Sequence, residues 1–432
     1  MTMNRLSGQR QLIKNVAIAA SGPAGAQLLT IAVSPILTRL YGPEAFGYLG
    51  SFTAIANILA PLAALTYPLA IVLAKDETEA SQVTKLSAVA SLAIAFAILA
   101  AVLIAHALPP NWSAINSLGL YTAALPLAAL ISAWISIGQQ VAIRNEKFSQ
   151  VSTSAISGSL ASNTLKVLIG TVSPNAMLLI AITIFGQFIQ ACHIFWSTGT
   201  KSYLKVRDSI FIEAKAIIAI AKKYSDFPTY RASQTLISSA SMSLPIIFLT
   251  ATYGIKAAGY YALAFSVTSM PSNLLGKAVA DVFYPNITKR IVNGEDVSRA
   301  LIRSTLILLS IGFIPYGALV AAGPILFSTI FGDAWYIAGE YAAALSILFL
   351  MNFSNKPAIA AVPALGIQKG LLVYEVLSTL TKLLALIFSA RFGLTDSQAI
   401  FAYSVLGAAS YLLMIGWIML ISKKSYQARK EK

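Results

Sequence analysis

Long apolar stretches separated by short polar segments dominate the hydrophobicity pattern of this chain. A membrane-spanning helix needs about 20 consecutive, largely apolar residues. The pattern predicts twelve such helices, centred near residues 28, 60, 96, 130, 160, 186, 239, 271, 311, 349, 380 and 409. A transmembrane β-barrel would instead show alternating segments of about ten residues. We therefore predict an all-α polytopic membrane protein.

Composition agrees with this prediction and argues against most enzyme classes. The chain is 57% hydrophobic and only 11% charged, whereas soluble proteins average about 25% charged residues. The predicted outer loops are too short for a catalytic domain. The sequence has no P-loop, no HExxH motif and no cysteine cluster, and its histidines, His106 and His193, are too few for a metal site. We expect a transporter with no cofactor and no metal.

The basic residues are distributed asymmetrically, which explains the net charge of +15 without nucleic acid as a partner. With the N-terminus in the cytoplasm, the predicted inner segments hold 23 Lys and Arg residues and the outer segments only three, Arg39, Lys256 and Arg391. This bias follows the positive-inside rule. It predicts a cytoplasmic (inner) membrane protein with an uncleaved first helix and both termini in the cytoplasm. Cys192 lies within an apolar span and has no intrachain disulfide partner.

An internal repeat relates the two halves of the chain. Residues 37–48 read LTRLYGPEAFGY and residues 249–260 read LTATYGIKAAGY, with seven of twelve positions identical. The repeat predicts two six-helix bundles. The predicted boundaries are 1–200 for the first bundle, 201–226 for a basic linker, 227–422 for the second bundle and 423–432 for a basic tail. The linker fits either an interfacial helix attracted to anionic lipid or a plain interdomain connection.

Five basic residues lie inside predicted spans: Lys166, Arg231, Lys277, Lys356 and Lys382. Each costs roughly 3 kcal/mol at the centre of a membrane helix, so a water-filled cavity or an anionic partner should compensate. Lys166, Arg231 and Lys356 lie near span ends, where a long side chain can also reach the membrane surface. Lys277 and Lys382 lie deeper and are the stronger candidates for a functional role.

Polar residues accompany these cations at helical spacing. The eighth span carries Ser266, Ser269, Asn273, Lys277, Asp281 and Tyr284 on one face. Similar stripes occur in the first span (Gln27, Thr30, Ser34, Thr38, Tyr41), the fifth (Ser152, Ser159, Asn163, Lys166), the seventh (Arg231, Gln234, Ser238, Ser241) and the eleventh (Gln368, Glu375, Ser378, Lys382). Such stripes either join helices, as a Lys277–Asp281 ion pair would, or line a polar cavity.

Cations outnumber acids within the predicted spans, where the deep carboxylates are Asp281 and Glu375. A positive interior favours anionic cargo, because Lys and Arg bind phosphate and carboxylate. The positions one repeat before Lys277 and Asp281 are Leu65 and Leu69. We therefore expect the second half to hold more of the cargo contacts.

The sequence resembles a known family of transporters. The first-span ending LTRLYGPEAFGYLGSF, its partial repeat at Tyr253, and IFGDAW at residues 330–335 are similar to polysaccharide or O-antigen flippases of the multidrug/oligosaccharidyl-lipid/polysaccharide exporter (MOP) superfamily. The resemblance implies two six-helix bundles facing across a V-shaped cavity. It also implies alternating access for an oligosaccharide on polyprenyl (undecaprenyl) pyrophosphate, moved to the periplasmic leaflet for O-antigen, lipopolysaccharide, exopolysaccharide or capsule synthesis. A polysaccharide polymerase and chain-length proteins are the expected partners.

The candidate site follows from the stripes and from this resemblance. The candidate substrate-binding cations are Lys277, Lys382, Lys166, Arg231, Lys356 and Arg39, with Asp281 and Glu375 as possible ion-coupling residues and Asn273, Gln27, Asn163 and Gln234 as polar cavity residues.

Three other functions remain open at this stage. A multidrug or cation antiporter of the same superfamily would prefer an acidic cavity. A polysaccharide polymerase or glycosyltransferase would need a larger reaction platform outside the membrane. A non-transporting assembly factor would leave the buried cations unexplained.

Overall fold

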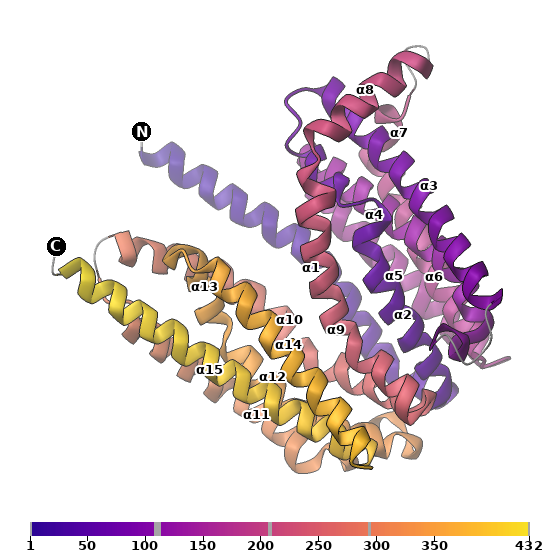
Figure 1. Ribbon diagram of the computed structural model, residues 1–432, viewed down its shortest axis with the longest axis vertical. Coiled ribbons are helices and arrows are strands. Elements are labelled where there is room, and N and C mark those ends of the chain that lie inside the picture. The colour runs from indigo at the N-terminus through magenta and orange to yellow at the C-terminus, as the bar shows by residue number, and fades with distance from the viewer. Residues whose placement is uncertain (1, 108–113, 206–209, 293–294, 431–432) are drawn as a thin grey trace. The chain divides into compact units, whose positions relative to one another are not determined.

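Helices joined by short turns make up the computed structural model in the residues that it describes (Figure 1). The backbone is described over residues 2–107, 114–205, 210–292 and 295–430. Side chains are described over 21–107, 119–205, 215–274 and 295–430, apart from 369, 425 and 428–430, and also at 283, 287 and 290. All twelve predicted span centres fall within helices of the structure, so the all-α prediction is confirmed.

The first part of the chain contains α1 (Thr2–Leu40), α2 (Pro43–Ala63), η1 (Tyr67–Ile71), α3 (Glu77–Ala107), η3 (Ala114–Ala124), α4 (Leu125–Arg144), α5 (Phe148–Gly170), α6 (Ala176–Thr198), α7 (Thr200–Tyr203), α8 (Ile210–Lys223), the π-helical turn η4 (Phe227–Arg231) and α9 (Ala232–Tyr253). The second part contains α10 (Ile255–Val292), α11 (Ser298–Phe331), η5 (Asp333–Trp335), α12 (Tyr336–Ser354), α13 (Lys356–Leu365), α14 (Gln368–Arg391) and α15 (Asp396–Lys430). A kink at Ala322, just before Pro324, bends α11.

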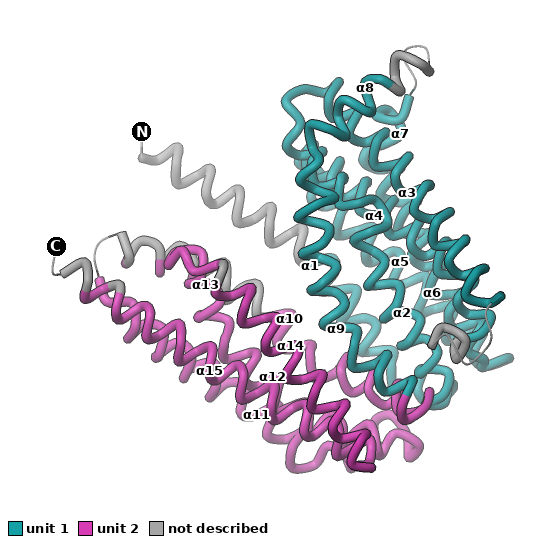
Figure 2. Tube along the Cα trace, in the orientation of Figure 1, with its two compact units in different colours: residues 1–251 teal, residues 252–432 magenta. Residues whose placement is uncertain are grey.

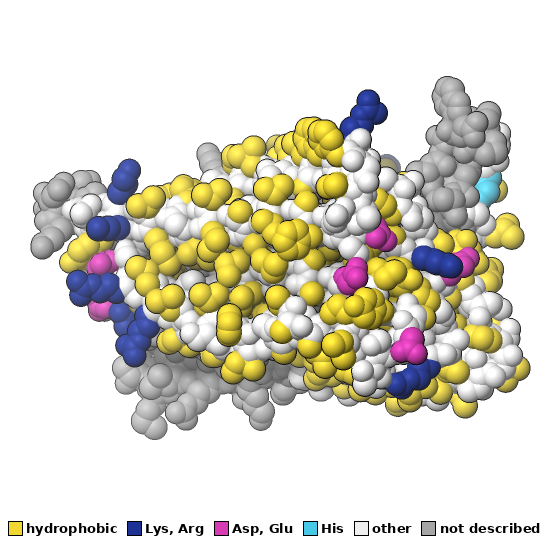
Figure 3. Space-filling view, turned by 90° about the horizontal axis from the view of Figure 1, so that it is seen from below, with side chains coloured by type: hydrophobic (Ala, Val, Ile, Leu, Met, Phe, Trp, Pro, Cys, Tyr) yellow, Lys and Arg dark blue, Asp and Glu magenta, His cyan; other side chains and the backbone are white. Residues whose placement is uncertain are grey.

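Nine helical segments within the described residues are long and apolar enough to cross a membrane. They contain α2, α3, α4, α6, α9, α11, α12 with α13, α14 and α15. Of the other predicted spans, α1 and α10 are only partly described. Helix α5 is 23 residues long but is more polar, because Ser, Thr, Asn and Lys lower its hydropathy. The chain is therefore an all-α multi-pass membrane protein, and the face in Figure 3 is accordingly largely apolar, with Lys and Arg toward its ends.

Two compact units divide the chain, Met1–Ala251 and Thr252–Lys432 (Figure 2). All but the last two residues of α9 belong to unit 1, where the hydroxyls of Ser51 and Thr250 are hydrogen-bonded at 2.6 Å. In the same unit, the Thr66 hydroxyl donates to the Phe227 carbonyl at 3.0 Å. This division follows contacts, whereas the predicted boundary at 201–226 follows the sequence repeat, and the repeat-based organisation stays a prediction.

Apolar clusters and close helix crossings stabilise each unit. In unit 1, α2, α3, α4 and α6 bury a cluster around Phe52, Ile98, Ile131 and Ile180. In unit 2, Leu301 and Val362 pack with Met414 and Ile418 of α15. Helices α11 and α12 approach closely at two glycines, because a Cβ on Gly339 would lie 2.4 Å from the Gly323 carbonyl oxygen. Small residues at such crossings are typical of membrane helix packing.

The predicted linker forms α8, which packs against unit 1. Ile217, Ile220 and Ala221 contact a cluster that includes Val83 of α3 and Ile137 of α4. Burial of this apolar face favours a linker that is packed on unit 1 over one without contacts to it.

Two carboxylates at the start of α3 hold the linker in place. Glu79 accepts hydrogen bonds from the Lys223 ammonium and from the Tyr224 hydroxyl. Glu77 accepts from Tyr203 at 2.6 Å and from Arg144 at 3.0 Å. We call this set of contacts, centred on Glu77 and Glu79, the linker clamp.

Candidate functional site

The polar stripes predicted on the first and fifth spans meet in unit 1. The Asn163 amide donates to the Thr30 hydroxyl at 3.0 Å and to the Ser159 carbonyl at 2.9 Å. Ser159 in turn donates to the Ala26 carbonyl at 3.0 Å, across to α1. We call the contact line between α1 and α5 the polar seam. Its hydroxyl groups bond mainly to one another and to backbone, as expected for polar residues that join membrane helices.

One end of the polar seam is closed by Tyr41. Its side chain is only 1% exposed, and its hydroxyl donates to the Lys166 carbonyl at 3.0 Å. Gly170 allows this approach, because a Cβ there would lie 2.8 Å from the tyrosine ring. The repeat places Tyr253 at the equivalent position, and its hydroxyl donates to the Leu394 carbonyl, just beyond α14, at 3.2 Å. Each repeat tyrosine thus reaches the C-terminal end of the fifth predicted span of its half.

Lys166 is buried beside the seam, with 8% of its surface exposed. Among the described side chains, none of the ion pairs includes this lysine. One turn earlier on α5, the Oδ1 atom of Asn163 is buried and accepts no hydrogen bond from any residue in the described part of the chain. Burying a charge and an amide oxygen without partners is costly. These two groups therefore have hydrogen-bonding capacity that their described neighbours do not use.

Unit 2 contains a second polar cluster, between α10, α12, α14 and α15. The Ser272 hydroxyl donates to Asn352 Oδ1 at 2.6 Å, and Asn352 Nδ2 donates to the Tyr411 hydroxyl at 2.6 Å. Ser410 is hydrogen-bonded to Ser378 at 2.8 Å and receives a bond from Tyr374 at 3.3 Å. Amide, hydroxyl and phenol groups from four helices thus gather within one unit.

Lys382 and Glu375 lie on α14 beside this cluster. Lys382 is half-buried, whereas Glu375, two turns earlier, is exposed. The two charges interact electrostatically. The Lys382 stem packs over Gly407 of α15, where a Cβ would lie 3.2 Å from the lysine Cδ. Glycine at this position therefore leaves room for a long cationic side chain against α15.

The structure places the other predicted site residues separately. Arg231 and Gln234 are exposed, and the guanidinium donates to Gln234 Oε1 at 3.1 Å. Lys356 is half-buried at the start of α13, Arg39 is exposed in the last turn of α1, Asn273 is exposed on α10, and Gln27 is partly buried on α1. Lys277 and Asp281 lie on α10, and their side chains are outside the described residues.

The family match covers most of the chain. Residues 36–340 match the family model for polysaccharide biosynthesis proteins. The chain belongs to the polysaccharide biosynthesis protein family. This finding confirms the predicted resemblance at the level of the family. No curated protein sequence matches the chain.

Solved structures with the same fold are MOP superfamily transporters. An inward-facing multidrug resistance MATE transporter has a TM-score of 0.71 and 16% identity, covering 96% of this chain and 99% of that protein. A MATE transporter in complex with MaL6 has a TM-score of 0.57 and 15% identity, with 97% and 100% covered. A MOP transporter from Pyrococcus furiosus, described as having a binding pocket of reversed polarity, has a TM-score of 0.51 and 15% identity, with 97% and 99% covered. This member of the polysaccharide biosynthesis family thus has a transporter fold.

Sequence reasoning missed part of the unit 2 cluster. Ser410 and Tyr411 lie in a predicted span without an internal cation, and Asn352 lies in a span whose one cation, Lys356, was predicted near the span end. Asn352 offered one signal, because an amide within an otherwise apolar span needs a hydrogen-bonding partner. The partners themselves were not predictable, since they come from helices distant in the sequence.

Proposed function

We propose that this protein is a flippase for an oligosaccharide repeat unit linked to polyprenyl pyrophosphate. It moves the lipid-linked unit from the cytoplasmic to the periplasmic leaflet of the inner membrane, for O-antigen, exopolysaccharide or capsule synthesis. Two findings support the proposal: the match to polysaccharide biosynthesis proteins, and the fold shared with MOP transporters. A polysaccharide polymerase and chain-length proteins would then use the translocated unit.

The observation that carries the proposal is the buried cation of unit 1. Lys166 is 8% exposed and has no carboxylate ion-pair partner among the residues described. A pyrophosphate supplies the negative charge that such a lysine needs, whereas a cationic drug would be repelled. The Pyrococcus furiosus transporter is described as having a binding pocket of reversed polarity, which suggests a different function for it. It is a precedent for a change of pocket polarity within this fold.

In the proposed mechanism, the protein exposes its binding groups alternately to the two leaflets. Lys382, Lys277 and Lys166 bind the pyrophosphate in turn, and the prenyl chain remains in the lipid. Hydroxyl and amide groups such as those of Asn352 and Tyr411 bind sugar hydroxyls. Asp281 and Glu375 are candidates for coupling this cycle to an ion gradient.

Leaflet exchange of a labelled substrate tests the proposal. Purified protein is reconstituted into vesicles with a fluorescent polyprenyl-pyrophosphate oligosaccharide, and a membrane-impermeant quencher reports the leaflet that holds the label. We expect protein-dependent exchange under a proton gradient. Lys277→Ala and Lys382→Ala should each slow it by about tenfold, because each removes a charge-assisted contact. No exchange by the wild type, or lengthening of the glycan chain, would overturn the proposal.

A further inference from the structure

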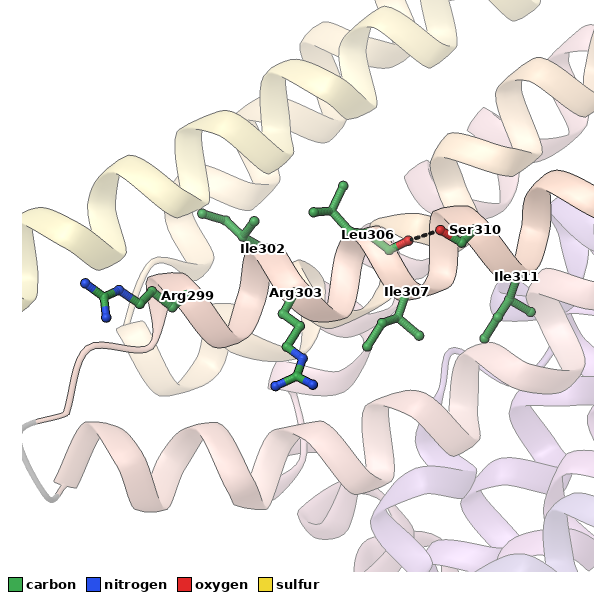
Figure 4. A pocket seen from close by; sticks show the side chains of 7 residues that line it. All are labelled: Arg299, Ile302, Arg303, Leu306, Ile307, Ser310 and Ile311. Atoms are coloured by element: carbon green, nitrogen blue, oxygen red, sulfur yellow. Dashed lines mark hydrogen bonds between the residues drawn. The ribbon is translucent and has the colours of Figure 1, made fainter.

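One exposed face of α11 lines a pocket of about 510 Å³ in unit 2. The described residues that line it are Arg299, Ile302, Arg303, Leu306, Ile307, Ser310 and Ile311, all from α11 (Figure 4). These positions recur at spacings of three and four, so they share one face. The opposite face of α11, which includes Leu301 and Leu308, is buried.

Two arginines form the polar end of this pocket. Arg299 and Arg303 are exposed and lie one helical turn apart. Neither takes part in an ion pair with another described residue. The carboxylate near Arg299 belongs to Asp296, which accepts a hydrogen bond from the Ser298 backbone N–H at 2.9 Å. That bond lowers the pKa of Asp296, and the nearby charge of Arg299 lowers it as well.

An apolar stripe continues from the arginines along α11. The side chains of Ile302, Leu306, Ile307 and Ile311 are between 43% and 54% exposed. An ordinary lipid-facing surface is apolar too, but it has no pair of guanidinium groups at one end. The pocket is thus amphipathic along the helix axis: its N-terminal end is cationic, and the rest of its lining is mostly apolar.

We propose that this pocket binds the polyprenyl diphosphate carrier, with the diphosphate on Arg299 and Arg303 and the first isoprene units along the apolar stripe. The inference rests on the proposed flippase function. Guanidinium groups bind phosphate oxygens in bidentate fashion, and residues four apart on a helix lie about 6 Å from each other, so two arginines match two linked phosphates. A single stripe suits one linear chain better than the paired chains of a phospholipid. Both arginines belong to a predicted cytoplasmic segment, so the pocket holds the carrier in the leaflet from which it is loaded.

Binding of a sugar-free probe tests this site. Undecaprenyl diphosphate is titrated onto the purified full-length protein in detergent, and bound lipid is counted by native mass spectrometry. Arg299→Gln/Arg303→Gln should weaken binding by about tenfold or more. The matched control is Lys201→Gln/Lys205→Gln, which removes two exposed cations at the same spacing. The control should bind the probe as tightly as the wild type.

A second variant tests the hydrocarbon part of the pocket. Ile307→Trp fills the stripe with a larger side chain at an exposed position, so folding should be preserved. It should weaken binding of undecaprenyl diphosphate while leaving binding of inorganic pyrophosphate unchanged. Equal losses of phosphatidylglycerol and undecaprenyl diphosphate in the arginine variant would overturn the proposal in favour of a general phospholipid site. Unchanged binding of undecaprenyl diphosphate in the double arginine variant would also overturn the proposal.

Transport measurements separate this proposal from the flippase function. If the wild type exchanges lipid-linked oligosaccharide but the arginine variant binds and exchanges it equally well, only the α11 site fails. If the wild type neither binds the probe nor exchanges the oligosaccharide, the flippase function fails as well.

Discussion

For Lys166, the cost of the buried charge to folding stability can be separated directly from the proposed role of that charge in binding substrate. A buried ammonium without a carboxylate partner destabilises a folded protein, and an apolar side chain of similar size does not. We expect Lys166→Met to leave the thermal unfolding midpoint unchanged or raised, and to slow oligosaccharide exchange by about tenfold. Unfolding is followed by intrinsic fluorescence in detergent, and exchange is measured in vesicles.

The matched control is Lys75→Met, which removes an exposed lysine from a predicted cytoplasmic segment of unit 1. It should change neither the unfolding midpoint nor the exchange rate. A parallel loss of stability and exchange in Lys166→Met would assign Lys166 a structural role in the polar seam.

Single residues were predicted unevenly from the sequence, for physical reasons. Lys166 and Asn163 stood out because charge and amide groups are costly in an apolar span. The partners of Asn163 in the polar seam, Thr30 and Ser159, were predicted only as members of stripes, since hydroxyl groups are common in membrane helices. That Lys166 is buried, whereas Arg231 is exposed, depends on tertiary packing, which the hydropathy of one helix does not contain.

At the scale of elements, the linker clamp predicts that Glu79 holds the end of α8 against α3, and this prediction can be tested. Glu79→Gln removes the charge that receives the Lys223 and Tyr224 hydrogen bonds. We expect trypsin to cleave the 201–226 segment faster by about threefold or more, because local opening exposes its lysines. Glu146→Gln, which neutralises an exposed carboxylate beyond α4, should leave cleavage unchanged. Equal cleavage in both variants would mean that the apolar contacts alone hold α8.

The pH dependence of the clamp has a defined sign. The hydrogen bond to Glu79 raises the pKa of Lys223 above its ordinary value of 10.5. A raised pKa of a basic group stabilises the folded state below the ordinary value and loses this effect as the pH rises through the folded value. Cleavage by a protease active over the range should therefore not change between about pH 7 and pH 9 on account of Lys223.

The sequence repeat also allows two helix junctions to be compared. Its two copies span the helix junctions α1–α2 and α9–α10, and both repeat tyrosines bond to a backbone carbonyl. The junctions nevertheless differ, because Gly254 has a φ of 91° and Gly42 a φ of −72°. Pro43 starts α2, whereas Ile255 stands at the equivalent position of α10, so a proline ring restricts only the first of the two turns.

At the scale of the whole molecule, charge distribution makes a prediction that hydropathy does not. Hydropathy locates spans, but the direction of insertion depends on where Lys and Arg lie. The 23 to three bias predicts that both termini are cytoplasmic. The same assignment puts Arg299 and Arg303 in the leaflet where the carrier lipid is loaded.

Site-directed labelling tests this orientation. In a Cys192→Ala background, which lacks the chain's single cysteine, Lys256→Cys and Lys201→Cys introduce one thiol each at exposed positions. A membrane-impermeant maleimide should label Lys256→Cys in spheroplasts and Lys201→Cys only after permeabilisation, because the two lie on opposite predicted sides. Labelling of Lys201→Cys alone in intact spheroplasts would invert the topology. The α11 pocket would then face the outer leaflet, and a carrier lipid bound there would be arriving after transport instead of waiting for it.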